Sequence, residues 1–202
     1  MVERVNSLLL LVDLQNAFCD AGGSIAGLGW DITTLQAAAH QCNHLAVEAR
    51  ERGIPVAWTR MMFRADYSDA GLVRRMRPNL CRLGGLRAGT ADVELTDLVD
   101  VAADDIIIDK ARHSSLYGTS LEVILRARGI ERVIVGGVTT SMCVETTVRD
   151  LAQRDYEVIL PREACADFDA ARHEASLAVM AFGFARVVPI AETFVTPPLP
   201  HA

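Results

Sequence analysis

Residues 132–147 read RVIVGGVTTSMCVETT, which is a short aliphatic run, two glycines and a polar stretch with one cysteine. An aliphatic run without polar alternation predicts a strand buried on both faces, as in parallel sheets covered by helices. The glycine pair predicts a tight turn, and Thr140 or Ser141 can cap the helix expected after it. These residues therefore indicate a strand, a turn and a helix, with Cys143 in the first helical turn.

The same pattern recurs along the chain, because short aliphatic runs alternate with longer helical stretches. Six runs are expected to be strands: residues 8–13, 54–59, 105–109, 132–136, 157–160 and 185–189. Four stretches are expected to be helices: residues 32–52, 120–128, 141–154 and 170–182. This alternation predicts an α/β fold of three layers, with a doubly wound sheet of six parallel strands. Ligands of such sheets bind beyond the carboxyl ends of the strands.

The alternation spans most of the chain, so we expect a single domain over residues 1–202. Residues 60–100 interrupt it with seven arginines, and they predict a long irregular insertion. The insertion is interpreted as a lid, an oligomer contact or a solvated loop. Three prolines in residues 193–202 predict an extended tail.

The composition excludes several classes of function. A net charge of −6 argues against nucleic acid or an anionic membrane as the main partner. No stretch approaches the ~20 apolar residues needed to span a bilayer. The first aliphatic run is short and ends in Asp13, so we interpret it as a buried strand and not as a signal peptide. The five cysteines are widely spaced and form no CxxC pair, which favours a reducing cytoplasm over a disulfide framework.

Cys143 is the first candidate for chemistry. Free backbone N–H groups and the helix dipole at the start of a helix favour a thiolate, which lowers the pKa of the thiol. The same N–H groups can bind the oxyanion of a tetrahedral intermediate. A buried cysteine that packs as a small hydrophobic residue is the alternative, and this motif alone leaves both interpretations open.

A cysteine nucleophile needs a partner that takes its proton. Of the five histidines, only His113 falls near a strand end. Asp13 ends the first aliphatic run, where burial would raise its pKa and suit it to proton transfer, unless it only caps the next segment.

Lys110 ends the third predicted strand and is the only lysine among 20 basic residues. A lysine is a compact charge, and between an acid and a thiol it would lower the pKa of both. The alternative is an ordinary surface lysine.

Three segments together resemble the isochorismatase-like cysteine hydrolases. They are residues 11–18 around Asp13, residues 109–119 around Lys110, and residues 137–147 around Cys143. The resemblance extends from about residue 7 to residue 192, with all three motifs in the right order. It implies an Asp–Lys–Cys triad in which Cys143 attacks a carbonyl, Asp13 acts as general acid and base, and Lys110 orients and supports both. It also implies a thioester acyl-enzyme that water hydrolyses.

The resemblance further implies a cis peptide between Val138 and Thr139. That bond would aim the N–H groups of Thr139 and Cys143 into an oxyanion hole. Nicotinamidases of the family carry an Asp-x-His…His metal site, and residues 59–67 contain no histidine, so no metal and no cofactor are expected. True isochorismatases cleave a vinyl ether and lack the cysteine, so Cys143 argues against that reaction.

What remains resembles the hydrolases of N-carbamoylsarcosine, ureidoacrylate and biuret. We therefore expect an amidohydrolase of a small linear amide, carbamoyl or ureido compound, in the cytoplasm, as a homodimer or homotetramer. The alternatives are a vinyl-ether hydrolase and a catalytically silent binding or scaffold protein. Candidate substrate-binding residues are Gln15, Phe18, Trp30, Arg112, Tyr117 and Thr140.

Overall fold

A parallel sheet forms the centre of the structure, a computed structural model that describes residues 5–195 and residue 197. The strands lie in the order β3-β2-β1-β4-β5-β7, and β6 pairs with β4 beside this path. All of these pairs are parallel. The strands are β1 Ser7–Val12, β2 Val56–Met61, β3 Ile106–Lys110, β4 Arg132–Val138, β5 Glu157–Pro161, β6 Cys165–Ala166 and β7 Arg186–Val188.

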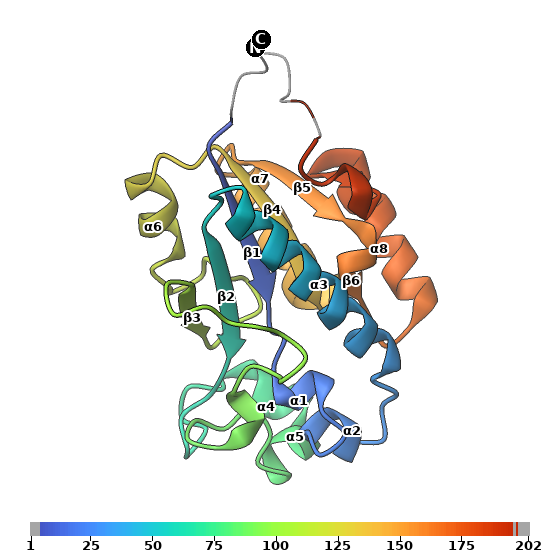
Figure 1. The fold of residues 1–202 in the computed structure, drawn as a ribbon. Coiled ribbons are helices and arrows are strands. Elements are labelled where there is room, and N and C mark those ends of the chain that lie inside the picture. Colours follow the sequence, from blue (N-terminus) through green and yellow to red (C-terminus); the bar gives the residue numbers. More distant parts are fainter. Residues whose placement is uncertain (1–4, 196, 198–202) are drawn as a thin grey trace.

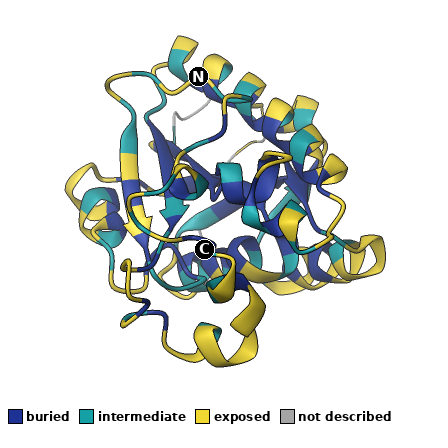
Figure 2. Ribbon diagram, turned by 90° about the horizontal axis from the view of Figure 1, so that it is seen from below, coloured by how far each residue is buried: buried dark blue, intermediate teal, exposed yellow. Residues whose placement is uncertain are grey.

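Strand β1 lies in the middle of the sheet, and its complete burial requires a covering layer on both faces of the sheet. All six of its residues are buried, and Leu8 to Leu11 have no exposed surface. A fully buried leucine stabilises the fold by about 1.5–3 kcal/mol. Figure 2 shows the buried central strands surrounded by helices whose outer faces are exposed.

The helices form the outer layers. The longer ones are α3 Thr33–Glu51, α6 Leu121–Ala127, α7 Glu145–Ala152 and α8 Ala170–Gly183. In Figure 1, α3 lies in front of the sheet and α7 lies behind it. That placement follows from right-handed crossovers, because β2 and β5 lie on opposite sides of the β1–β4 pair. Among the described residues, no helix is both long and apolar enough to cross a bilayer.

Four short helices gather below the carboxyl ends of the strands (Figure 1). They are α1 Asn16–Cys19, α2 Ser24–Gly27, α4 Leu72–Met76 and α5 Pro78–Arg82. Four single turns complete the described chain: η1 Ala91–Val93, the π-helical η2 Thr140–Val144, η3 Arg162–Ala164 and η4 Ile190–Glu192. We call α2, α4 and α5 the cap.

The α/β fold and all six expected strands are confirmed, with their ends displaced by at most two residues. The two-residue β6 is too short to leave a pattern in the sequence. The helix expected over 141–154 is instead the turn η2 followed by α7. The irregular segment expected over 60–100 begins within β2 and contains α4 and α5. Of the expected tail, only residues 193–195 and 197 are described, and Thr193 is buried there.

Gly137 stands where β4 passes closest to β1. It pairs with Val12, and its φ of +119° is a conformation that only glycine adopts readily. A Cβ atom at this position would lie 2.2 Å from the Val12 carbonyl oxygen, which is rigid backbone. Glycine is therefore required at this position, where β4 packs against the end of β1 just before Asp13.

We expect Gly137→Ala to lower the free energy of unfolding by about 3 kcal/mol or more, because strain and a backbone clash add together. Gly53→Ala is the matched control, since Gly53 also has a positive φ but no atom within 4 Å of the new methyl group. We expect that control to cost about 1–2 kcal/mol in urea denaturation. Equal losses for the two variants would contradict the argument from close approach.

Candidate active site

Three side chains from distant parts of the chain meet at the carboxyl ends of the strands. Asp13 follows β1, Lys110 is the last residue of β3, and Cys143 lies in η2 just after β4. Asp13 is 0% exposed, Lys110 3% and Cys143 4%. The strand order changes direction between β1 and β4, which is where ligands bind in doubly wound sheets.

Asp13 and Lys110 form a buried ion pair. The Lys110 Nζ atom lies 2.6 Å from Asp13 Oδ2, and neither side chain is exposed. The other oxygen, Oδ1, accepts a hydrogen bond of 2.6 Å from the Thr59 hydroxyl of β2. Burial lowers the pKa of Lys110, but the Asp13 carboxylate and Cys143 outweigh burial and hold that pKa above its ordinary value.

The Lys110 ammonium is fixed by two further contacts. It donates to the backbone carbonyl of Arg112 at 3.2 Å and to that of His113 at 3.1 Å. An ammonium has three N–H donors, which it shares among Asp13, these two carbonyls and the Cys143 thiol. The cation is therefore held in one position beside the acid.

The Cys143 thiol faces this ion pair and also contacts a histidine. Its Sγ atom lies 3.6 Å from Nδ1 of His113. Burial raises the pKa of the thiol well above 9.0, and the nearby Lys110 charge lowers it only in part. The sequence predicts a lowered pKa, whereas in the structure burial outweighs the Lys110 charge and the pKa of the thiol is raised.

The peptide bond between Val138 and Thr139 is cis. It comes immediately before η2, the turn that carries Cys143. The Thr139 carbonyl accepts hydrogen bonds from the backbone N–H groups of Met142 and Val144, at 3.1 and 3.2 Å. This backbone therefore folds tightly around the cysteine.

A cavity of about 190 Å³ that is partly open to solvent lies beside Cys143. Its polar wall is formed by His113, Thr139, Ser141, Asp167 and two arginines, Arg77 and Arg172. Most of the remaining wall is apolar and comes from the cap, the segment after β1 and the loop before α3. These apolar residues are Phe18, Ile25, Leu28, Trp30, Met61, Val73, Leu80, Leu86, Met142 and Phe168.

Two of the predicted substrate-binding residues, Phe18 and Trp30, line this cavity. Trp30 also packs against Phe168, with ring centroids 5.2 Å apart. The wall does not include Gln15, which is fully buried and bonds the backbone. Its amide donates to the Met61 carbonyl and accepts from the Met61 N–H, so its visible role is structural.

Arg112, Tyr117 and Thr140 also lie outside the cavity wall. The Arg112 guanidinium bonds the carbonyls of Asp69 and Ala111. Tyr117 is 67% exposed, and Thr140 is buried with its hydroxyl 2.8 Å from His173 Nδ1. For these residues, sequence proximity to a motif was a poor guide to position.

Asp167 is a site residue that sequence reasoning missed. Its Oδ2 accepts from the N–H and the hydroxyl of Ser141, and its Oδ1 accepts from the Arg172 guanidinium. It therefore fixes the start of η2 and balances the charge of Arg172. Asp167 follows β6, whose two residues give no strand signal.

Arg77 was noticed only as one of the arginines of residues 60–100. It is exposed at the cavity, and it makes no ion pair within the described part of the chain. The other two cations around the thiol, Lys110 and Arg172, each have an aspartate partner. One positive charge at the cavity therefore remains unbalanced.

Residues 5–195 and 197 contain no group of three or more acidic, histidine or cysteine side chains that could hold a metal ion.

A buried acid–lysine pair and a thiol beside a cavity, at the switch point of a parallel sheet, indicate an α/β enzyme with a site for a small molecule. Comparison with known proteins gives a match to the isochorismatase domain over residues 7–192. The chain belongs to the isochorismatase family, which confirms the resemblance drawn from its motifs.

Individual relatives agree with this assignment. The chain is 33% identical over 172 residues to ureidoacrylate amidohydrolase RutB of Methylorubrum extorquens, covering 78% of this chain and 68% of that protein. The structure of a cysteine hydrolase from Pseudomonas syringae pv. phaseolicola is 30% identical, with a TM-score of 0.86 over 94% of this chain and 91% of that one. N-carbamoylsarcosine amidase from Thermoplasma acidophilum is 24% identical, with a TM-score of 0.74 over 92% and 97% of the two chains, and shares the fold. The family and these relatives identify the chain as a hydrolase of carbon–nitrogen bonds other than peptide bonds.

We expect Lys110→Met to lower the free energy of unfolding by about 3–5 kcal/mol, because it leaves the buried Asp13 charge without its partner. The double variant Asp13→Asn/Lys110→Met should recover part of that loss, since no unpaired charge remains. Urea denaturation of both variants measures the difference.

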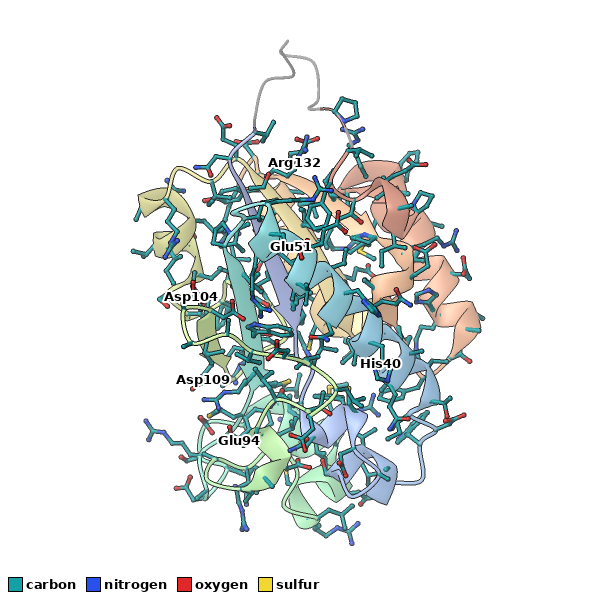
Figure 3. All side chains as sticks on the ribbon, in the orientation of Figure 1. His40, Glu51, Glu94, Asp104, Asp109 and Arg132 are labelled. Atoms are coloured by element: carbon teal, nitrogen blue, oxygen red, sulfur yellow. The ribbon has the colours of Figure 1, made fainter. Side chains whose placement is uncertain are left out.

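Asp109→Asn is the matched control, because Asp109 is the residue before Lys110 and pairs with Arg60 at the surface. Figure 3 shows Asp109 and Glu94 toward the site end of the molecule and Arg132 at the opposite end. An exposed pair contributes about 0–1 kcal/mol, so this variant should stay close to the parent. A double variant less stable than Lys110→Met would contradict the account of the buried pair.

Proposed function

We propose that this enzyme is a cysteine-dependent amidohydrolase that cleaves a small linear ureido or carbamoyl compound. The observation that supports it most is the buried Asp13–Lys110 pair beside the Cys143 thiol, which lines a cavity. A carboxylate held by a cation can take a proton from a neighbouring group without leaving its position. A thiol beside it can act as the nucleophile.

In the first half-reaction, Asp13 takes the Sγ–H proton while Sγ forms a bond with the substrate carbonyl carbon. The carbonyl oxygen becomes an oxyanion, and we assign its stabilisation to the backbone N–H groups of Thr139 and Cys143. The carbon–nitrogen bond then breaks. Asp13 returns its proton to the leaving nitrogen, which departs as ammonia or an amine, and a thioester to Cys143 remains (with a ureido substrate, a thiocarbamate).

In the second half-reaction, Asp13 accepts a proton from water as the water oxygen attacks the thioester carbonyl. The carbon–sulfur bond breaks, and the proton returns to Sγ. Lys110 holds the Asp13 carboxyl group in place through both halves, because its own position is fixed by three acceptors.

We assign recognition of a carboxylate on the substrate to Arg77. Its charge is the one at the cavity that no described acidic side chain balances, and a guanidinium binds a carboxylate with two parallel hydrogen bonds. The apolar cap would then cover the carbon chain between that carboxylate and the ureido group. Ureidoacrylate, named as the substrate of the RutB relatives, has both groups and is the first compound to test.

Cys143→Ala should abolish ammonia release from ureidoacrylate, a loss of at least about 10⁴-fold, because the thioester cannot form. Cys81→Ala in α5 is the matched control, since that cysteine is free and does not line the cavity. Ammonia release that survives Cys143→Ala would contradict a cysteine mechanism. Release of pyruvate from isochorismate by the parent enzyme would indicate vinyl-ether cleavage instead.

Arg77→Met should raise KM for ureidoacrylate about 10–100-fold, since a hydrogen bond to a charged group contributes about 1.5–3 kcal/mol. Its effect on the primary amide of the same compound should be small, because that analogue has no carboxylate. Arg75→Met in α4 removes an exposed arginine that does not line the cavity, and KM should stay unchanged. Equal effects of Arg77→Met on both substrates would remove Arg77 from this role.

A further inference from the structure

The Cys143 sulfur needs a hydrogen-bond donor when it becomes a thiolate. It is buried, and burial disfavours the charged form. The Lys110 ammonium interacts with the sulfur, but it also donates to Asp13 Oδ2 and to the carbonyls of Arg112 and His113. The ammonium therefore divides its three N–H groups among four acceptors, and a second donor would stabilise the thiolate further.

His113 is in position to be that donor. Its Nδ1 lies 3.6 Å from Sγ, within the range of hydrogen bonds to sulfur. Its backbone carbonyl also accepts from Lys110, so the same residue is anchored to the ion pair and contacts the nucleophile. His113 and Cys143 both line the cavity.

The charges around His113 keep its ring neutral. Besides Cys143, it faces Lys110 at the end of β3, Asp13 after β1, Arg112 on its own segment and Arg77 between α4 and α5. Burial and the three cations together outweigh Asp13 and lower the pKa of His113 below 6.5. A neutral imidazole carries one N–H. In the tautomer with that hydrogen on Nδ1, the N–H group points toward the Cys143 sulfur.

We propose that His113 is a further catalytic residue, whose ring Nδ1–H donates to Cys143 Sγ and stabilises the thiolate as Asp13 takes the thiol proton. This inference rests on the proposed function for the identity of the nucleophile. The proton moves from Sγ to the Asp13 carboxylate, the hydrogen bond from His113 shortens as charge develops on sulfur, and His113 keeps its own proton throughout.

The test is the rate of iodoacetamide labelling at Cys143 as a function of pH, which needs no substrate. His113→Phe removes the donor and should raise the apparent pKa of the thiol by about one unit. Labelling near neutral pH should then slow about tenfold. His113→Asn places an amide N–H at the position of Nδ1 and should label within about threefold of the parent.

His40→Gln is the matched control, because His40 is exposed on α3 and lies outside the cavity wall (Figure 3). It should label as the parent does. A His113→Phe variant that labels like His40→Gln, or a His113→Asn variant as slow as His113→Phe, would overturn the inference. If the labelling results hold and no ureide is hydrolysed, the proposed substrate class fails and the thiolate donor stands.

Discussion

The burial of one pair of opposite charges, Asp13 and Lys110, is the constraint on which the site depends. Two charges removed from water are tolerated only where short contacts and further hydrogen bonds offset the cost of desolvation. Strand β2 lies between β1, which ends just before Asp13, and β3, which ends at Lys110, so the Lys110 side chain reaches across β2. Thr59 of β2 donates a hydrogen bond to the other oxygen of Asp13. A compact ammonium fits three converging acceptors better than a planar guanidinium does. This explains why position 110 holds a lysine in a chain whose other Lys/Arg positions are all arginine.

Much of this arrangement follows from the sequence. The aliphatic runs predict the strands because a parallel sheet covered on both faces needs strands without polar alternation. The carboxyl ends of such strands meet at one edge of the sheet, so Asp13, Lys110 and Cys143 were expected to lie together, and they do. These three positions could be predicted because each residue lies at the end of a strand or shortly after it in the sequence.

The features that the sequence did not predict depend on long-range packing. Helices of four or five residues, such as α2 and α4, are too short for a periodic pattern of apolar residues. Asp167 acquires its role only when β6 brings it to Ser141. The pKa of Cys143 moves in the direction opposite to our expectation, because the sequence shows a helix start and does not show how deeply the tertiary fold buries it.

The cap and the sheet are under different structural constraints: the cap helps to shape the cavity, and the sheet positions the charged pair. Its helices have four or five residues each, and none has a side-chain hydrogen bond at its N-cap. Each helix contributes one apolar residue to the cavity wall: Ile25, Val73 and Leu80. Substitutions there change the shape of the cavity without disturbing the sheet or the charged pair. Natural variation in the cap can therefore alter which compound is accepted while the bond-breaking residues stay in place. Chains of this architecture can thus change their substrate specificity without changing their reaction chemistry.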